Sequence, residues 1–247
     1  MKDQSWFINI DIEINHGCNL SCDYCPNSVA TRKEQGFMSM DLFEKILLQL
    51  QDIQFKGRIC YHFYNEPLLH PQLEEFVALS KKLLPQSRSE IYSNGMYINE
   101  DKYKRLRLAG VDKFTITKHQ GIKNLVFDEV YSKLSANEKK TIDYADHSTL
   151  LYSNRGGKVD YGRALTDTLK KRPCLIPIFN PVVTVKGNVL TCYEDFDQTH
   201  TMGSINDQHI KEIWLSENYV NFRNDLKSGL REKYPVCRDC NNIQVIS

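Results

Sequence analysis

The stretch FINIDIEINHGCNLSCDYC, residues 7–25, runs from a strand pattern directly into three closely spaced cysteines. Its isoleucines at positions 8, 10, 12 and 14 alternate with polar residues, which is the period of a β-strand. Cys18, Cys22 and Cys25 then follow at a C-x3-C-x2-C spacing. The sequence therefore predicts three thiolates in a loop just beyond the end of the first strand.

These cysteines are an incomplete ligand set for zinc, because a structural zinc site takes four ligands and His16 is the only obvious spare. A [4Fe–4S] cluster is held by thiolates at short spacings. If three thiolates hold it, one iron keeps an open position for a substrate or cofactor. We therefore expect a cluster here. The alternatives are a zinc knuckle completed by His16, or cysteines that merely gather in the core.

Beyond residue 25 the chain alternates between helix and strand patterns, with Ser39 as the N-cap of the first helix. Such alternation predicts an α/β fold: a partial (β/α)6 barrel of parallel strands, with functional loops at the carboxyl ends of the strands. The expected helices are 39–53, 70–84 with Pro71 in its first turn, 98–110 and 123–134, and the expected strands are 7–15, 58–64, 89–95, 111–119, 141–146 and 149–154.

The character of the chain changes after residue 154. We expect domains at 1–155 and 170–247, joined by a polar, turn-rich linker at 156–169. The second domain reads as a small α+β unit with a β-hairpin turning at Gly187-Asn188, a helix over 209–229 and a closing CRDC segment. A unit of this size needs a cross-link, such as a bound metal or cluster, to be stable. Its cysteines, which a zinc ribbon would also use, are Cys174, Cys192, Cys237 and Cys240.

Composition limits the partners and the compartment. The formal net charge of +1 gives no reason to expect a nucleic-acid or anionic-membrane partner. No apolar run is long enough to cross a membrane, and residues 1–15 carry acids in place of a signal-peptide pattern. Eight cysteines without an export signal predict a cytoplasmic protein whose thiols are reduced and serve as metal ligands.

The C-x3-C-x2-C motif, with Tyr24 before its last cysteine, resembles the radical S-adenosylmethionine (SAM) superfamily. YNEPLLHP at 64–71 is similar to the family's GGEP segment, and IYSNG at 91–95 to its third-strand segment, although each alone would be an ordinary turn. The resemblance implies that the open iron chelates the amino and carboxylate groups of SAM. The residues implied at this cofactor are Tyr24, Asn65 (where the family usually has glycine), Glu66 on the methionine ammonium group, Ser93 and Asn94.

The second cysteine set resembles the SPASM/Twitch auxiliary-cluster domains of radical enzymes. Four cysteines match the shorter Twitch form, which implies one fully ligated [4Fe–4S] cluster for electron transfer or structural support. The implied cofactors are thus two [4Fe–4S] clusters and SAM.

Segments along nearly the whole chain, among them SNRGG at 153–157 and VVTVKGNVLTCYEDF at 182–196, resemble the radical dehydrogenases of aminoglycoside antibiotic biosynthesis. The implied reaction oxidises a secondary alcohol of a small polar substrate, an aminocyclitol or a sugar-like molecule, to a ketone. A 5′-deoxyadenosyl radical takes the carbinol hydrogen, the hydroxyl proton leaves, and one electron passes to the auxiliary cluster. A flavodoxin- or ferredoxin-type electron donor is also implied. Arg155 is implied at the substrate alcohol, and weaker catalytic candidates are His119 and Glu194.

Three other functions stay open from the sequence. A radical epimerase would use Cys60, the eighth cysteine, as a hydrogen donor, although a buried free cysteine more often serves packing. A maturase of ribosomal peptides often carries a leader-binding domain, and the 17 residues before Cys18 favour a small substrate instead. A non-catalytic zinc protein would use both cysteine sets for structure or binding.

Overall fold

The computed structural model describes residues 6–122, 125–162 and 164–242. The two predicted domains extend to residues 1–5 and 243–247, and the predicted helix 123–134 begins at residues 123–124; these positions lie outside the described residues, as does position 163 of the predicted linker. The boundaries at 156 and 170 remain predictions.

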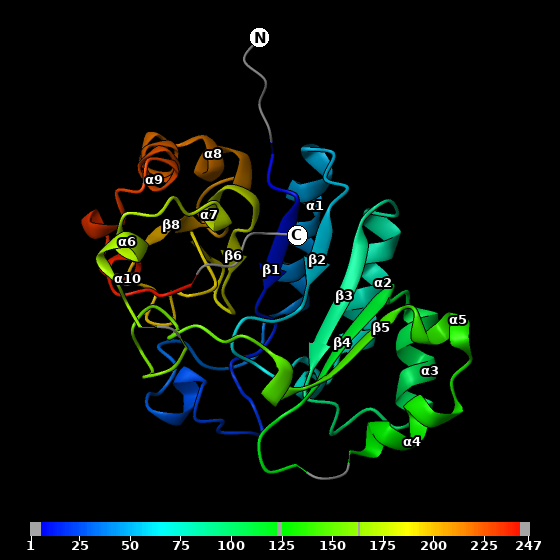
Figure 1. Cartoon of the computed structure of the whole chain (residues 1–247). Helices are drawn as coiled ribbons and strands as arrows, with labels where there is room; N and C mark the ends of the chain where they lie inside the picture. The colour runs from blue at the N-terminus through cyan, green and yellow to red at the C-terminus, as the bar shows by residue number, and fades with distance from the viewer. Residues whose placement is uncertain (1–5, 123–124, 163, 243–247) are drawn as a thin grey trace.

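The first half of the chain alternates strand and helix as predicted, and neighbouring strands pair in parallel (Figure 1). This confirms the α/β fold. The elements are β1 Asn9–Ile12, η1 Pro26–Ser28, α1 Met40–Asp52, β2 Arg58–Cys60, η2 Pro67–Leu69, α2 Leu73–Leu83, β3 Arg88–Ser93, α3 Glu100–Ala109, β4 Lys113–Lys118, α4 Val126–Lys133, α5 Ala136–Lys139, β5 Ile142–Asp146 and η3 His147–Thr149.

The second half continues the same sheet, whose strand order is β5-β4-β3-β2-β1-β6-β7-β8. Strand β6 pairs in parallel with β1, and β7 and β8 extend the sheet with antiparallel pairing. The elements are α6 Asp167–Lys170, α7 Ile176–Phe179, β6 Val182–Val183, β7 Asn188–Leu190, β8 Thr201–Ser204, α8 Ile210–Leu215, α9 Glu217–Lys227, η4 Arg231–Lys233 and α10 Pro235–Arg238.

Three predicted elements differ from the structure. The strand expected at 149–154 is absent, because Leu150 and Leu151 are exposed and have no sheet face to bury against; the sixth strand of the parallel set is β6, on the far side of β1. The helix expected at 209–229 is split at Ser216, whose side chain caps α9. Pro71 precedes α2 instead of lying in its first turn. The predicted hairpin of β6 and β7 is confirmed, with its turn just before Asn188.

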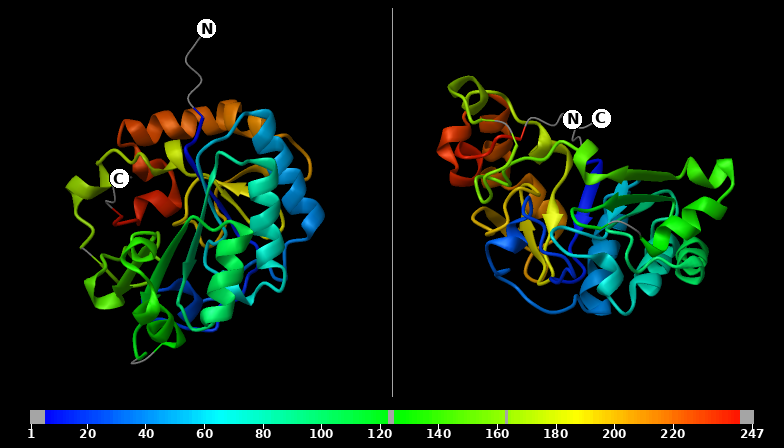
Figure 2. Two further views of the ribbon diagram at one scale, coloured as in Figure 1. Left: turned by 90° about the vertical axis from the view of Figure 1, so that its right-hand side faces the viewer. Right: turned by 60° about the horizontal axis from the view of Figure 1, so that its bottom comes forward.

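The alternation in β1 divides an apolar face from a polar one. Ile10, Ile12 and Ile14 are fully buried in the main core, while Ile8, at the edge of the strand, is half exposed. Helices α1, α2 and α3 pack side by side over one face of the sheet (Figure 2). Asp11 and Glu13, between the isoleucines, are buried as well and pair with arginines, so the other face holds a polar interior.

Ser39 caps α1, as predicted, because its side chain accepts a hydrogen bond from the backbone N–H of Leu42. We expect Ser39→Ala to lower the free energy of unfolding by about 1 kcal/mol, since the amide loses its partner. Leu48→Ala, on the exposed side of the same helix, is the control and should change stability little. Denaturant unfolding of both variants measures the difference, and equal losses would contradict the capping role.

Candidate functional site

The first cysteine set lies in the loop between β1 and η1, at the carboxyl end of β1. All three cysteines are free and half-buried. Burial raises the pKa of Cys18 to about 11, and the charges of Glu66, Cys25 and Cys22 add to this shift. The backbone N–H of Leu20 hydrogen-bonds the Cys18 sulfur at 3.5 Å.

Glu66 ties this loop to the ends of β2 and β3. Its backbone N–H donates to the carbonyl of Gly17 in the cysteine loop. Its buried carboxylate accepts hydrogen bonds from the Ser93 hydroxyl and the Asn94 backbone N–H, both at 2.8 Å, and from the backbone N–H of Leu68. Burial raises the pKa of Glu66 to about 7, and these three donors oppose the shift. The structure thus brings Glu66, Ser93 and Asn94 together beside the first cysteine set.

Asn65 keeps an ordinary negative φ, so its replacement of glycine does not strain the backbone. Its side chain accepts a hydrogen bond from the backbone N–H of Phe63 and donates to Asn15 Oδ1, both at 2.8 Å. Asn15 in turn donates to the carbonyls of Gly17 and Glu66. Asn65 therefore braces the turn and the cysteine loop.

Tyr24 meets His119, which the sequence suggested as a separate catalytic candidate. The Tyr24 hydroxyl lies 2.6 Å from His119 Nδ1. Burial lowers the pKa of His119 to about 4, which keeps the imidazole neutral. The Tyr24 ring also stacks on Tyr152 at 4.2 Å. His119 thus lies against the first cysteine loop.

The second cysteine set is gathered from three segments. Cys174 precedes α7, Cys192 follows β7, and Cys237 and Cys240 belong to α10 and the residues after it. Burial raises the pKa of each, to about 12 for Cys240, and the charges of Cys174 and Cys240 raise those of Cys192 and Cys237 further. Backbone N–H groups two residues on hydrogen-bond the Cys192 and Cys240 sulfurs at 3.4 Å, which is the kind of contact that tunes iron–sulfur ligands.

The spacing of the sulfurs tests zinc against a cluster. Tetrahedral zinc with Zn–S bonds of about 2.3 Å would hold its sulfurs about 3.8 Å apart. Within the described residues, three or more ligand atoms lie within 4.8 Å of one another in a single group, and it contains none of the seven predicted cluster cysteines. Wider spacing fits a cluster, in which different thiolates bind different irons.

Arg155 and Glu194 lie between the two cysteine sets. Arg155 Nη1 is 3.9 Å from Glu194 Oε1, and the Arg155 charge also acts on Cys25. The buried Glu194 carboxylate accepts hydrogen bonds from the Ser153 hydroxyl at 2.8 and 2.9 Å and from Asn242 Nδ2 at 2.5 Å. The structure thus joins two catalytic candidates that lie 39 positions apart (194 minus 155) in the sequence.

The SNRGG segment needs its glycines to reach this position. Arg155 has φ 50° and Gly156 has φ 64°. A Cβ on Gly156 would lie 2.9 Å from the Glu194 carbonyl oxygen and 2.6 Å from a methyl group of Val236. Only glycine lets the linker pass this close to the second cysteine set.

Tyr64 is a further residue in this region, and the sequence analysis did not select it as a site candidate. Its buried hydroxyl has no hydrogen-bond partner among the described residues. Its ring packs against Phe196 at 5.1 Å between centroids, in a cluster that also contacts Cys25 and Tyr193, the neighbour of Cys192. The available signal was its position directly before NEPLL, two residues after His62 on the same side of an extended segment.

Comparison with known proteins places the chain in a family. Residues 12–121 match the Radical SAM superfamily, and residues 174–241 match SPASM, an iron–sulfur cluster-binding domain. The S-adenosyl-L-methionine-dependent 2-deoxy-scyllo-inosamine dehydrogenase of Niallia circulans is 42% identical over 239 residues, which are 97% of this chain and 94% of that protein. The chain belongs to the radical SAM superfamily.

Two solved structures resemble this radical SAM chain over 98% of its length and 95% of theirs. BtrN in complex with AdoMet and 2-DOIA has a TM-score of 0.91 and 42% identity. BtrN in an open conformation has a TM-score of 0.80 and 36% identity. The radical SAM chain is therefore closer in shape to the complex than to the open form.

These matches show a radical SAM oxidoreductase that takes a [4Fe–4S] cluster and SAM, with an auxiliary iron–sulfur domain. The non-catalytic zinc protein is thereby excluded. No helix within the described part of the radical SAM chain is long and apolar enough to cross a membrane.

Proposed function

We propose that this enzyme oxidises a secondary alcohol of an aminocyclitol to a ketone, with 2-deoxy-scyllo-inosamine as the substrate. The relative from Niallia circulans acts on that compound by name. One observation supports the proposal beyond family membership: Arg155 lies 3.9 Å from the buried Glu194, and the nearby buried hydroxyl of Tyr64 has no hydrogen-bond partner among the described residues. Such a site suits a small molecule with several hydroxyl groups and an amine.

Arg155 and Glu194 have complementary roles in this proposal. The guanidinium donates hydrogen bonds but does not accept a proton, so Arg155 stabilises alkoxide-like charge on the reacting oxygen. Glu194 accepts hydrogen bonds from substrate hydroxyl or ammonium groups. Ser153 and Asn242 hold its carboxylate in place, which limits the reorganisation needed on binding. Tyr64 offers a hydroxyl to a third polar group of the substrate.

Two [4Fe–4S] clusters complete the proposal. Cys18, Cys22 and Cys25 would hold one, and Cys174, Cys192, Cys237 and Cys240 would hold the other. When bound, the first cluster with SAM supplies the radical that removes a hydrogen atom, and the second supplies an acceptor for the electron that leaves. A flavodoxin- or ferredoxin-type protein is the proposed electron donor.

Deuterium at the carbinol carbon tests this reaction. We expect 5′-deoxyadenosine to carry the deuterium and the ketone to form in equal amount, as mass spectrometry would show. Unlabelled deoxyadenosine together with unchanged substrate would contradict hydrogen abstraction from that carbon. An epimer of the substrate in place of the ketone would favour the radical epimerase.

Glu66 should make SAM binding depend on pH. Its pKa is raised to about 7, so the carboxylate is mostly protonated at pH 5.5 and mostly ionised at pH 7.5. Because the ionised form attracts the methionine ammonium group, we expect SAM affinity to rise about tenfold over this range. Calorimetric titration of the anaerobic holoenzyme measures it. Glu66→Gln should bind more weakly with little pH dependence, and an equally steep rise in that variant would assign the effect to another group.

A further inference from the structure

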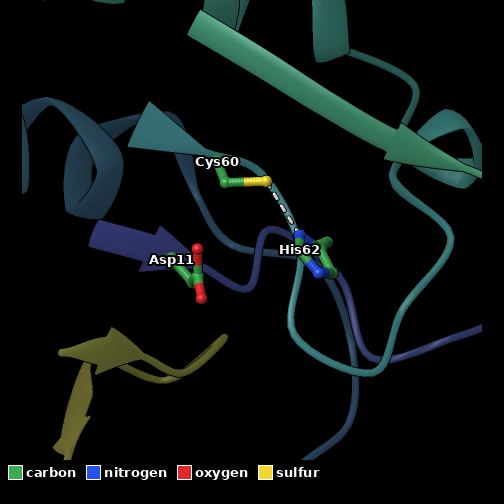
Figure 3. A group of neighbouring side chains, drawn as sticks. All are labelled: Asp11, Cys60 and His62. Atoms are coloured by element: carbon green, nitrogen blue, oxygen red, sulfur yellow. Dashed lines mark hydrogen bonds between the residues drawn. The ribbon is translucent and has the colours of Figure 1, made fainter. Parts of the chain in front are cut away.

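A second group of potential metal ligands lies in the polar interior of the sheet. Asp11, Cys60 and His62 lie together (Figure 3), and one ligand atom of each lies within 4.8 Å of the other two. Asp11 and Cys60 are buried, and His62 is partly exposed. None of the three belongs to either cysteine set.

The strands position these ligands. Asp11 on β1 and Cys60 on β2 are direct register partners in the parallel pair. His62 follows Cys60 by two residues, and side chains at that separation point to the same side of an extended chain. The Cys60 sulfur lies 2.8 Å from His62 Nδ1. Two adjacent strands and the residues just after β2 thus bring oxygen, sulfur and nitrogen donors together.

Surrounding side chains hold the carboxylate as a ligand would be held. Asp11 Oδ1 accepts a hydrogen bond from Arg58 at 3.3 Å, and Oδ2 accepts one from Asn180 Nδ2 at 2.6 Å. Each carboxylate oxygen has a second lone pair available for a metal. The His62 ring stacks on Tyr92 with 4.7 Å between centroids, which fixes its plane. Outer contacts of this kind orient ligands and tune metal affinity.

The charge of the surroundings favours a cation. Two buried carboxylates, Asp11 and Glu90, face one largely buried guanidinium, Arg58, at 3.3 and 3.6 Å. The guanidinium of Arg88, which also pairs with Glu90, is mostly exposed and therefore screened. When a divalent ion binds and the thiol loses its proton to solvent, the buried charges of Asp11, Glu90, Arg58, Cys60 and the ion sum to zero.

We propose that Asp11, Cys60 and His62 bind one divalent transition-metal ion, zinc by preference. Thiolate, imidazole and carboxylate together are the donors that zinc takes in proteins, and magnesium or calcium would take oxygen donors alone. Three protein ligands leave a fourth position for water or a heteroatom of a bound molecule. When the metal binds, Cys60 and His62 each bond to it in place of their mutual hydrogen bond, and the thiol proton is released to solvent.

Zinc retention by the iron-loaded holoenzyme tests this site. The anaerobically reconstituted protein is incubated with zinc chloride, desalted and analysed for iron and zinc. We expect about one zinc per chain. X-ray absorption spectroscopy at the zinc edge should find a single sulfur among the zinc ligands. Zinc bound at an empty cluster position would have three or four sulfur ligands instead. Cys60→Ser and His62→Ala should each lose the zinc while the iron content stays unchanged.

Two further variants sharpen the test. Asn180→Ala removes a contact to Asp11 and should weaken zinc binding by about 10- to 100-fold. His209→Ala, which alters a partly exposed histidine beside Asp52, should retain the zinc. No retained zinc in the wild-type protein would overturn the proposal. Equal zinc in the Cys60 and His62 variants would also overturn it and would indicate adventitious zinc only. The iron content reports the clusters separately, so this failure is distinguishable from failure of the proposed function.

Discussion

We expect a Cys22→Ala variant to form no 5′-deoxyadenosine, and a Cys192→Ala variant to form it still and to lose only the ketone. The reason is that the two cysteine sets lie in different parts of the fold and share no ligand, as the β1–η1 loop carries one and the segments around α7, β7 and α10 carry the other. The first set is proposed to generate the radical and the second to take up the electron. Chromatography of deoxyadenosine and ketone measures both.

Iron analysis is the control for this pair. Each variant should keep about half of the iron of the wild-type protein, since one [4Fe–4S] cluster remains. A Cys192→Ala protein that holds this iron and still forms ketone at the wild-type rate would contradict an electron-transfer role for the second set. Loss of all iron in Cys192→Ala would instead indicate a folding defect, and Cys240→Ser would then replace it in the test.

Replacing Arg155 with lysine should lower the rate of ketone formation by about 100-fold, the scale of losing one charge-stabilising donor at an active site. Lysine keeps the positive charge next to Glu194, so the buried carboxylate stays paired. It lacks the planar fork of donors, and it is shorter, so the reacting oxygen loses its hydrogen bond. Deoxyadenosine should then form in excess of ketone, because hydrogen abstraction still occurs while the conversion of the substrate radical to the ketone is slowed.

Lys158→Met is the matched control for Arg155→Lys. Lys158 is a cation three positions after Arg155, and it pairs with the half-exposed Asp197 at 2.8 Å, whereas Arg155 faces the buried Glu194. We expect its ketone yield per deoxyadenosine to equal that of the wild-type protein. Similar uncoupling in both variants would assign the effect to the linker as a whole and would remove Arg155 from the site.

The sequence predicted the first half of the fold well because local patterns determine it. Ser39 has a cap partner three residues on, and Gly110 ends α3 in the left-handed conformation as expected of a C-terminal glycine. The prediction of a strand at 149–154 was wrong. Its apolar residues match a strand pattern, but whether they are buried depends on tertiary contacts that the pattern does not contain. The pairing of β6 with β1 could not be found from periodicity, since it joins residues about 170 positions apart.

The candidate site divides in the same way. The cysteines and Glu66 could be named because their motifs are local in sequence. The joining of Arg155 to Glu194, the contact of Tyr24 with His119 and the burial of Tyr64 depend on segments that only the folded chain brings together. The sequence placed Cys60 in packing or hydrogen donation, and its position opposite Asp11 required the strand register.

The ratio of ketone to 5′-deoxyadenosine, measured on the anaerobically reconstituted protein with reductant, SAM and 2-deoxy-scyllo-inosamine, tests the central claim most directly. About eight irons per chain and one ketone for each deoxyadenosine is the result that two [4Fe–4S] clusters and a radical dehydrogenase predict. Deoxyadenosine without ketone would contradict the dehydrogenation of this substrate. Absence of deoxyadenosine in an iron-loaded protein would contradict the radical chemistry itself.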